Sequence, residues 1–350
     1  MGSSVKACPN RIGLQPEAKL KPISSTLMDI SVVIVAWNAK HYLELCLESL
    51  VAAPPRRSME IIVVDNASSD GTAEMVEARF HHVKLIRSSE NLGFAKGNNL
   101  AIRQCQGRYI ALVNPDVIVF SGCVDALADF LDQNPKVGNV GPHVLNPDMT
   151  LQSTCRRFPT LWNNFCSATG LAAKFMNSRL FAGEHMFYFA HDRVLPVDVL
   201  VGCFSMIRHE TFNQVGLLDE DLFMYGDDVD WCRRCWKAGW QVVFFPGAKA
   251  IHDRGKTTAP YPVRFAVAQQ KSVLHYWRKH HGSWGSMGIR SIIFVHHLVR
   301  YGFAVLAGLA RAKQSAHGDV RKQVSGACLR AMFSDSAPAK ASTAAQSTSA

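Results

Sequence analysis

The sequence predicts an α/β protein: a mostly parallel sheet flanked by helices, with a helical extension at the C-terminal end. Runs of apolar and β-branched residues at 30–36, 61–64 and 109–113 show no alternation, as strands buried on both faces require. Helical spacing of apolar residues separates these runs, which is typical of βαβ units. The 350 residues, 48% hydrophobic and 19% charged, are those of a globular chain with a large core.

The first half of the chain follows this alternation. We expect strands at 30–36, 61–64, 83–86 and 109–113, with helices beginning after Asn38, after the turn at 65–72 and within 91–105. Asn38 is the expected N-cap of its helix.

The second half is less regular. Expected elements are a helix at 123–131, strands at 137–144 and 240–245, an extended loop at 151–159 and a β-rich run at 197–207. A further helix is expected from the acidic cluster at 227–230 to Gly239, and an extended piece at 248–252. Residues 160–195 have no clear period.

The composition suggests four segments. Residues 1–28 form a flexible leader without the apolar core of a signal peptide, and 29–282 form the main folded domain. Residues 283–333 form a basic amphipathic helical extension, and 334–350, rich in Ala, Ser and Thr, form a disordered tail.

The net charge of +10 is concentrated near the C-terminal end. Thirteen Lys and Arg lie between His252 and Arg330, against only Asp253 and Asp319. Such a segment favours a partner rich in phosphate: nucleic acid, a diphosphate or an anionic membrane. No recognisable DNA or RNA module is present, so we expect no nucleic-acid partner.

The helix expected at 290–311 is apolar but unsuited to crossing a membrane. His296, His297 and Arg300 lie in mid-span, where charge is costly. Its basic and apolar residues fall on opposite sides, which leaves two interpretations. The helix lies in a membrane interface, or it packs on the main domain with a basic face in solvent.

Ten cysteines are scattered along the chain, which favours reduced thiols in the cytoplasm over a disulfide framework. Cys232 and Cys235 have the spacing of half a zinc site, but no second Cys/His pair stands at zinc-finger spacing. The alternative is that both pack on one helix face.

Two acidic stretches stand out. Asn114-Pro115-Asp116 ends a predicted strand, and Asp227, Asp228 and Asp230 follow Gly226. An open α/β sheet binds its ligand at the carboxyl ends of its strands, so Asp116 is the expected metal-side residue and Asp228 the expected base. The glycine motifs of dinucleotide dehydrogenases and P-loop NTPases are missing, which disfavours both classes.

Five segments, in this order and spacing, resemble the inverting, GT-A-fold glycosyltransferases of family 2, most of all the bacterial rhamnosyltransferase-like members. The resemblance covers residues 28–282. It rests on Val33-Ile-Val-Ala-Trp-Asn38, Val63-Val-Asp-Asn-Ala-Ser-Ser-Asp-Gly-Thr72, Asn91-Leu-Gly-Phe-Ala-Lys-Gly-Asn-Asn99, Leu112-Val-Asn-Pro-Asp116 and Phe223-Met-Tyr-Gly-Asp-Asp-Val-Asp230.

This resemblance implies a metal-dependent inverting transfer of one sugar from a nucleoside-diphosphate donor, with rhamnose from a dTDP donor as the leading choice. The acceptor would be a polyprenyl-diphosphate-linked or cell-surface polysaccharide. The alternatives are a UDP-hexose donor with a soluble acceptor, or a non-catalytic relative that binds glycan or nucleic acid. The implied location is cytoplasmic, with a peripheral position on the inner face of the cytoplasmic membrane left open.

The resemblance also implies catalytic roles. Asp228 would be the general base and Asp227, where the family more often has Glu, would orient the acceptor. The alternative is that both residues only cap the following helix.

For the cation, the resemblance implies Asp116 and His252 as ligands, with Mn²⁺ or Mg²⁺ as the ion. The family's Asp-x-Asp motif is reduced here to Asn114-Pro115-Asp116, which leaves one carboxylate. The alternative for His252 is a capped strand end.

The remaining roles concern donor and acceptor. Implied donor-binding residues are Trp37, Asn38, Asp65, Asn66, Lys96, Asn114 and Asp116, although Lys96 has an ordinary exposed lysine as its alternative. Acceptor or phosphate contacts are assigned to Gln152, Arg156, Arg157 and Asp230, with a structural role for the 151–159 loop as the alternative.

Overall fold

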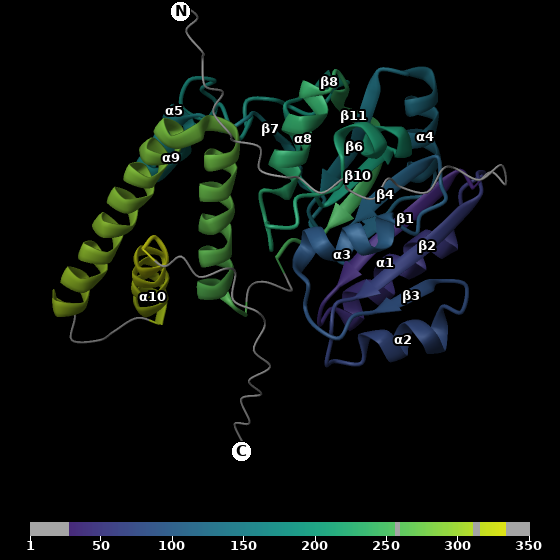
Figure 1. Ribbon diagram of the computed structural model, residues 1–350, viewed down its shortest axis with the longest axis horizontal. Helices are drawn as coiled ribbons and strands as arrows, with labels where there is room; N and C mark the ends of the chain where they lie inside the picture. Colours follow the sequence, from purple (N-terminus) through teal and green to yellow (C-terminus); the bar gives the residue numbers. More distant parts are fainter. Residues whose placement is uncertain (1–27, 256–259, 311–315, 334–350) are drawn as a thin grey trace, which may run out of the picture.

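The computed structural model describes residues 28–255, 260–310 and 316–333 (Figure 1). The predicted leader, apart from Met28, and the predicted tail at 334–350 lie outside the described residues. A twisted sheet with helices on both faces makes up the body of the molecule, and a long bent helix stands beside it.

The main sheet has nine strands in the order β3-β2-β1-β4-β10-β6-β11-β5, with β8 paired to β11. A two-stranded ribbon, β7-β9, lies apart from it. The strands are β1 Ile30–Ala36, β2 Met59–Asp65, β3 Lys84–Arg87, β4 Tyr109–Val113, β5 Val117–Val119, β6 Val137–Leu145, β7 Cys155–Arg156, β8 Leu195–Pro196, β9 Val199–Leu200, β10 Phe204–Arg208 and β11 Gln241–His252.

The four strands β3, β2, β1 and β4 are parallel, as the sequence predicts. β10 then enters antiparallel between β4 and β6, so the sheet as a whole is mixed. The β-rich run at 197–207 is therefore not one strand: it breaks at 201–203 into β9 and β10. The two pieces expected at 240–245 and 248–252 are one strand, β11, with a register shift between Phe245 and Lys249.

Ten helices are assigned within the described ranges. They are α1 Lys40–Ala52, α2 Thr72–Arg79, α3 Gly93–Ile102, α4 Cys123–Gln133, α5 Leu161–Thr169, α6 Leu171–Lys174, α7 His209–Val215, α8 Asp227–Lys237, α9 Pro262–Ala310 and α10 Ala316–Ala331. Side chains alternate along a strand, so Val32 and Ile34 pack in one core with α1, α2 and α4. Val33 packs in a second core with α3, α7 and α8.

The start of α1 differs from the prediction. Asn38 has a left-handed backbone (φ 48°) and does not cap the helix, whose N-cap position is Ala39. The Asp70 carboxylate accepts from the Lys40 N–H at 2.9 Å instead. The Asn38 Oδ1 accepts from the Ser69 N–H at 2.8 Å, so it fixes the turn that follows β2.

The C-terminal helices form an arm with a bend. α9 changes direction at Gly282 (φ 63°, ψ −160°), and α10 packs alongside it (Figure 1). Gln270 on α9 donates to the carbonyl of Cys328 at 2.9 Å. The distal half of α9 lies against α5, where His296 Nδ1 is 2.8 Å from the carbonyl oxygen of Ala168.

The cysteines of the described residues are all free and buried. Cys232 and Cys235 lie in the second core, where burial raises the pKa of Cys235 to about 12. Their placement agrees with the packing alternative.

Candidate active site

A cavity of about 260 Å³ opens at the carboxyl ends of β1, β2 and β4. Several predicted site residues line it: Trp37, Asn66, Asn114, Asp116, Asp227, Asp228 and His252. They come from both acidic stretches, which lie about 110 residues apart in the chain. The fold therefore brings the two stretches to one cavity.

Asp116 and His252 face each other at one side of this cavity. β5 runs antiparallel to β11 with Val117 opposite His252, and the Asp253 N–H donates to the Asp116 carbonyl at 2.9 Å. This pairing holds the Asp116 Oδ1 3.2 Å from the His252 Nε2. Both side chains are buried.

Gln152 determines which nitrogen of His252 carries the proton. Its Nε2 donates to Asn146 Oδ1 at 2.8 Å and to the His252 carbonyl at 3.0 Å, so its Oε1 is the acceptor. That oxygen lies 2.6 Å from His252 Nδ1, which is therefore protonated. The Nε2 lone pair is left facing the Asp116 carboxylate.

A lone pair facing a carboxylate requires a proton or a cation between them. Burial lowers the pKa of His252, but interactions with Asp116 and Cys203 outweigh it and raise the pKa to about 10. The same atoms, one imidazole nitrogen and one carboxylate oxygen, are ligands that Mn²⁺ accepts. The pair therefore fits a divalent cation chemically.

A second group of potential ligands is less suited to a cation. Asp219, Asp221 and His275 lie within metal-ligand distance of one another. However, Asp219 already receives hydrogen bonds from Lys279 at 2.5 Å and from His275 at 2.9 Å. These bonds overcome the effect of burial and hold the pKa of Asp219 well below its usual range. The Lys279 ammonium group already supplies a positive charge to the Asp219 carboxylate.

The second acidic stretch enters the cavity at the start of α8. Tyr225 and Gly226 both have left-handed backbones (φ 65° and 79°), a strained turn that places Asp227 and Asp228 at the first helical positions. Asp228 Oδ2 accepts from the Gly202 N–H at 3.1 Å, and its Oδ1 accepts from the Val229 N–H at 2.8 Å.

The carboxyl groups of Asp227 and Asp228 differ in pKa. Burial raises the pKa of Asp227 to about 8, and the neighbouring charge of Asp228 adds to this effect. Burial also raises the pKa of Asp228, but the N–H groups of Gly202 and Val229 favour its charged form. Burial therefore favours the protonated form of Asp227 more than that of Asp228, whose two oxygens accept N–H bonds.

Gly93 joins two of the predicted motifs. A side-chain carbon at Gly93 would lie 2.3 Å from the Phe223 carbonyl oxygen, and φ is +80°, so only glycine fits. The next residue, Phe94, donates its N–H to that same oxygen at 2.8 Å. The segment at 91–99 thus supports the segment that carries Asp227.

Two buried polar atoms at strand ends have no hydrogen-bond partner in the described structure: Asp65 Oδ1 at the end of β2 and Asn114 Oδ1 after β4. Asn66 differs: its amide donates to Asn91 and Gly93 and accepts from Leu92, so it holds the loop before α3. Asp65 itself does not line the cavity.

The sequence prediction missed an aromatic and basic wall. The Arg264 guanidinium lies 5.2 Å from the Trp37 ring centroid and 5.5 Å from that of Phe223, and Tyr261 lies 5.6 Å from Trp37. Arg254 also lines the cavity. Its position two residues after His252 was a usable signal, whereas Arg264 stands beyond the last predicted motif.

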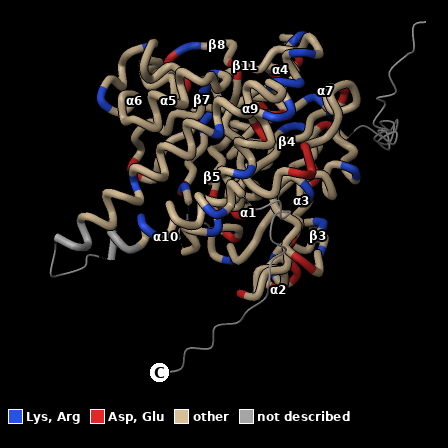
Figure 2. The backbone as a smooth tube through the Cα atoms, turned by 60° about the vertical axis from the view of Figure 1, so that its left-hand side comes forward, with Lys and Arg blue, Asp and Glu red and all other residues tan. Residues whose placement is uncertain are grey.

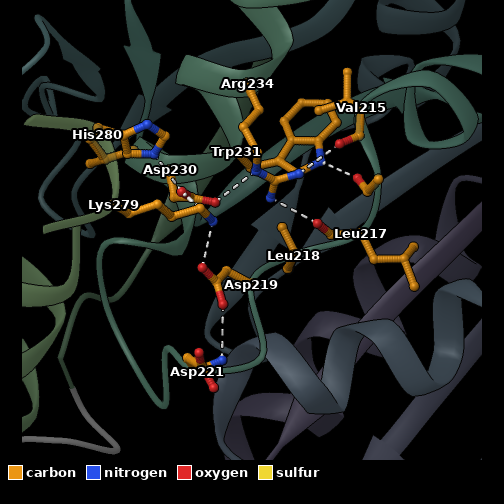
Figure 3. A network of polar contacts seen from close by, with 12 residues as sticks. Val215, Leu217, Leu218, Asp219, Asp221, Asp230, Trp231, Arg234, Lys279 and His280 are labelled. Carbon is orange, nitrogen blue, oxygen red and sulfur yellow. Dashed lines mark hydrogen bonds and ion pairs between the residues drawn. The ribbon is translucent and has the colours of Figure 1, made fainter. Parts of the chain in front are cut away.

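Seven predicted site residues do not line the cavity: Asn38, Asp65, Lys96, Gln152, Arg156, Arg157 and Asp230. Lys96 is exposed on α3, its charge close to Glu220, as the ordinary-lysine alternative expects. Asp230 is fully buried in an ion-pair network: Arg234, Lys279 and His280 approach it at 2.8, 2.8 and 2.7 Å (Figure 3). Burial would raise the pKa of Asp230, but these partners lower it to about 2.

The 151–159 loop places two side chains, Gln152 and Arg156, close to residues of the cavity. Gln152 orients His252, as described above. Arg156 donates to the His185 carbonyl at 3.2 Å, and its charge acts on Asp228. Arg157, its neighbour in sequence, is exposed and lines a different cavity.

Comparison with known proteins gives consistent matches. The model of the family described as "Glycosyl transferase family 2" matches residues 31–216. The chain is similar to N-acetylglucosaminyl-diphospho-decaprenol L-rhamnosyltransferase of Mycobacterium tuberculosis, with 29% identity over 300 residues, 77% of this chain and 94% of that protein. It is 26% identical to rhamnosyltransferase WbbL of Escherichia coli, covering 64% of this chain and 83% of that one.

Among solved structures, the crystal structure of GalNAc-T7 with UDP, GalNAc and Mn²⁺ aligns with a TM-score of 0.51 at 17% identity. The alignment covers 65% of this chain and 44% of that one. At this identity the likeness concerns the fold.

Proposed function

The chain belongs to glycosyl transferase family 2 and is a rhamnosyltransferase-like glycosyltransferase with the GT-A fold. We propose that it transfers one sugar, with inversion, from a nucleoside-diphosphate donor. The observation that carries the proposal is a single cavity that holds the Asp116–His252 pair and Asp228. One part of the cavity suits a diphosphate with its cation, and the other part suits a general base.

Asp116 and His252 would hold the cation, Mn²⁺ or Mg²⁺. The fit rests on the Nε2 of His252, which Gln152 directs toward the Asp116 carboxylate 3.2 Å away. When bound, such an ion neutralises charge on the leaving diphosphate. Arg254 and Arg264, close to the same wall, supply further positive charge for that group.

Asp228 would take the proton. In the transfer, an acceptor hydroxyl oxygen forms a bond to the anomeric carbon while the bond to the diphosphate oxygen breaks, and the hydroxyl proton moves to a carboxylate oxygen of Asp228. Burial raises the pKa of Asp228 and makes it a stronger base than an aspartate in water. Asp227, which keeps its proton, is able to donate a hydrogen bond to the acceptor.

The nucleoside would lie against Trp37, between β1 and β2. The buried, unpartnered Oδ1 of Asn114, which lines the cavity, is an acceptor that a base or ribose would satisfy. Asn38 holds the turn after β2 through its bond to Ser69.

The donor and acceptor are proposed by analogy with the relatives. One relative is named for transfer of rhamnose to a diphospho-decaprenol acceptor, and a Shigella flexneri relative, 23% identical, is named a dTDP-rhamnosyl transferase. We take dTDP-rhamnose and a sugar on a polyprenyl diphosphate as the leading pair.

The location proposed for this enzyme is the inner face of the cytoplasmic membrane. Beyond the bend at Gly282, α9 exposes the apolar side chains Val295, Leu298, Val299, Phe303 and Leu306, each 48–69% accessible. The apolar face of this helix is therefore not packed on the main domain. No Asp or Glu stands between Asp253 and Asp319, and Figure 2 shows acidic segments at several places on the main domain, α2 among them. An apolar helix with basic neighbours suits an anionic lipid surface.

By length and composition, one helix among the described residues, Pro262–Leu306, is apolar enough to cross a membrane. We retain the division into a main domain at 29–282 and an extension at 283–333 as part of the proposal.

The first experiment is calorimetric binding of dTDP, UDP and GDP, each with Mn²⁺ and with EDTA. We expect one nucleotide to bind only with Mn²⁺, and Asp116→Ala to remove that dependence. A transfer assay with the matching nucleotide sugar and a prenyl-diphosphate sugar then tests the reaction. A folded sample that binds none of the three nucleotides would contradict the proposal.

A further inference from the structure

A second cavity, of about 380 Å³, lies next to the β7-β9 ribbon and is lined by three arginines. Arg157 follows β7, Arg179 comes from the segment after α6, and Arg193 precedes β8. Tyr188 and a single carboxylate, Asp198, complete its polar lining. None of the sequence motifs accounts for this convergence of guanidinium groups.

The three charges have little compensation within the described part of the chain. Arg193 has one carboxylate partner, Asp192, at 3.2 Å, and both side chains are more than 60% accessible. Such exposed pairs are weak. Arg179 lies over the Tyr188 ring at 5.3 Å, a contact that leaves its N–H groups available. Asp198 already accepts from the Phe158 N–H at 2.9 Å. The cavity is thus suited to an anion with several oxygens.

The ribbon links this cavity to the proposed base. Arg156 on β7 pairs with Val199 on β9, so Arg157 and Asp198 lie just beyond one end of the ribbon. At the other end, Gly202 donates to Asp228. Five residues, Asp198 to Gly202, therefore connect the arginine cavity to the N–H that binds Asp228, and four steps along the chain span at most about 13 Å.

The cavity also borders an apolar surface. The segment that supplies Arg179 and Tyr188 exposes Phe175, Met176, Leu180 and Phe187, each 41–60% accessible. No Asp or Glu stands between Asp148 and Glu184. A molecule with a diphosphate between a lipid and a sugar has parts that match these features. Its lipid suits the apolar side chains, its diphosphate suits the arginines, and its sugar hydroxyl suits the base.

We propose that Arg157, Arg179 and Arg193 bind the diphosphate of a lipid-linked acceptor and so place its sugar at Asp228. This inference rests on the proposed function and adds to it the residues that select the acceptor. The planar guanidinium group suits phosphate oxygens because it donates two parallel hydrogen bonds.

The test compares two acceptors with the full-length protein. One is a sugar on a short prenyl diphosphate, and the other is the same sugar as an octyl glycoside, which lacks the diphosphate. We expect Arg157→Ala and Arg193→Ala each to raise KM for the diphosphate acceptor by about tenfold to a hundredfold, the value of a charge-assisted hydrogen bond. KM for the octyl glycoside and KM for the donor should stay unchanged. Arg87→Ala, which removes an exposed arginine paired with Glu74 and Glu77, is the control.

Other outcomes overturn the inference. An unchanged KM for the diphosphate acceptor, or an equal rise for both acceptors, means that the arginines do not bind the diphosphate. Loss of binding to phosphatidylglycerol vesicles with an unchanged KM would assign them to lipid headgroups instead.

Direct binding separates this inference from the proposed function. Inorganic pyrophosphate in EDTA should bind the wild-type protein and the Asp116→Ala variant, and the Arg157→Ala/Arg193→Ala double variant should lose this binding. If the wild-type protein transfers no sugar but binds pyrophosphate in this way, the function is wrong and the anion site stands. Absence of pyrophosphate binding to the wild-type protein refutes the site.

Discussion

Replacing Asp228 with Asn removes the proposed base with the smallest change in shape. In the wild-type protein its two oxygens accept from the N–H groups of Gly202 and Val229. The asparagine amide keeps one acceptor and sets an NH₂ group against the other N–H. The variant therefore tests proton transfer while the cavity keeps its volume.

The expected losses of kcat and of folding stability in the Asp228→Asn variant follow from this geometry. A positioned general base contributes about 10²–10⁴ in rate, so kcat should fall by that factor. This corresponds to about 2.7–5.4 kcal/mol in the barrier. One backbone N–H left without an acceptor costs about 1–3 kcal/mol of folding stability. Removal of a buried charge beside Asp227 offsets part of that cost, so the variant should stay folded.

The assay is the initial rate of transfer at saturating donor and acceptor from pH 5 to pH 9. Only the ionised carboxylate accepts a proton, so the wild-type rate should rise with pH through the raised pKa of Asp228. The variant should be slow at every pH and lose this rise, while its nucleotide affinity stays unchanged. Asp221→Asn, at an exposed carboxylate outside the cavity, is the matched control. A variant within tenfold of the wild-type kcat, with the same pH dependence, would refute the base assignment.

Three further predictions concern the supporting residues. Asp227→Asn should raise the melting temperature more at pH 8 than at pH 4: the folded-state pKa of about 8 exceeds the usual 3.8, so the wild type loses stability as pH rises between these values. An equal gain at both pH values would count against this. Gln152→Leu should weaken Mn²⁺ binding in the presence of nucleotide about 10–100-fold, because His252 loses the acceptor that orients it; an unchanged dissociation constant in a Mn²⁺ titration would separate Gln152 from the metal site. Gly93→Ala should lower stability to urea by about 1–3 kcal/mol, since its new methyl group would overlap the Phe223 carbonyl; wild-type stability would show that this contact relaxes.

Much of the first half of the fold was predictable because its strands are buried on both faces. Residues 30–36 are one β-branched run and form β1 with the same bounds. The direction of β10 was not predictable, since an antiparallel strand inside a parallel sheet has the same apolar pattern. β5 is three residues long, too short to show any period.

The sequence motifs predicted which residues meet in the cavity. They did not predict the neighbouring residues that hold those side chains in place. Asp116, Asp228 and His252 meet in one cavity, as their positions predicted, although their roles remain predictions. Asp230 looks like a member of the same acidic cluster in sequence. On α8 it faces away from the cavity, because a helix turns about 100° per residue and carries it toward Arg234 and α9.

The network in Figure 3 has a consequence for how much of the chain the catalytic domain needs. Lys279 on α9 is shared by Asp219 and Asp230, at 2.5 and 2.8 Å. A chain shortened to end after β11 would lose His275, Lys279 and His280, which leaves Asp219 without these partners and Asp230 with Arg234 alone. Removing one side of a buried ion pair strongly destabilises a fold. The part of α9 before the bend at Gly282 is therefore needed for the folding of the domain that positions Asp228. Shortened versions of this enzyme should begin their deletions only beyond the bend at Gly282.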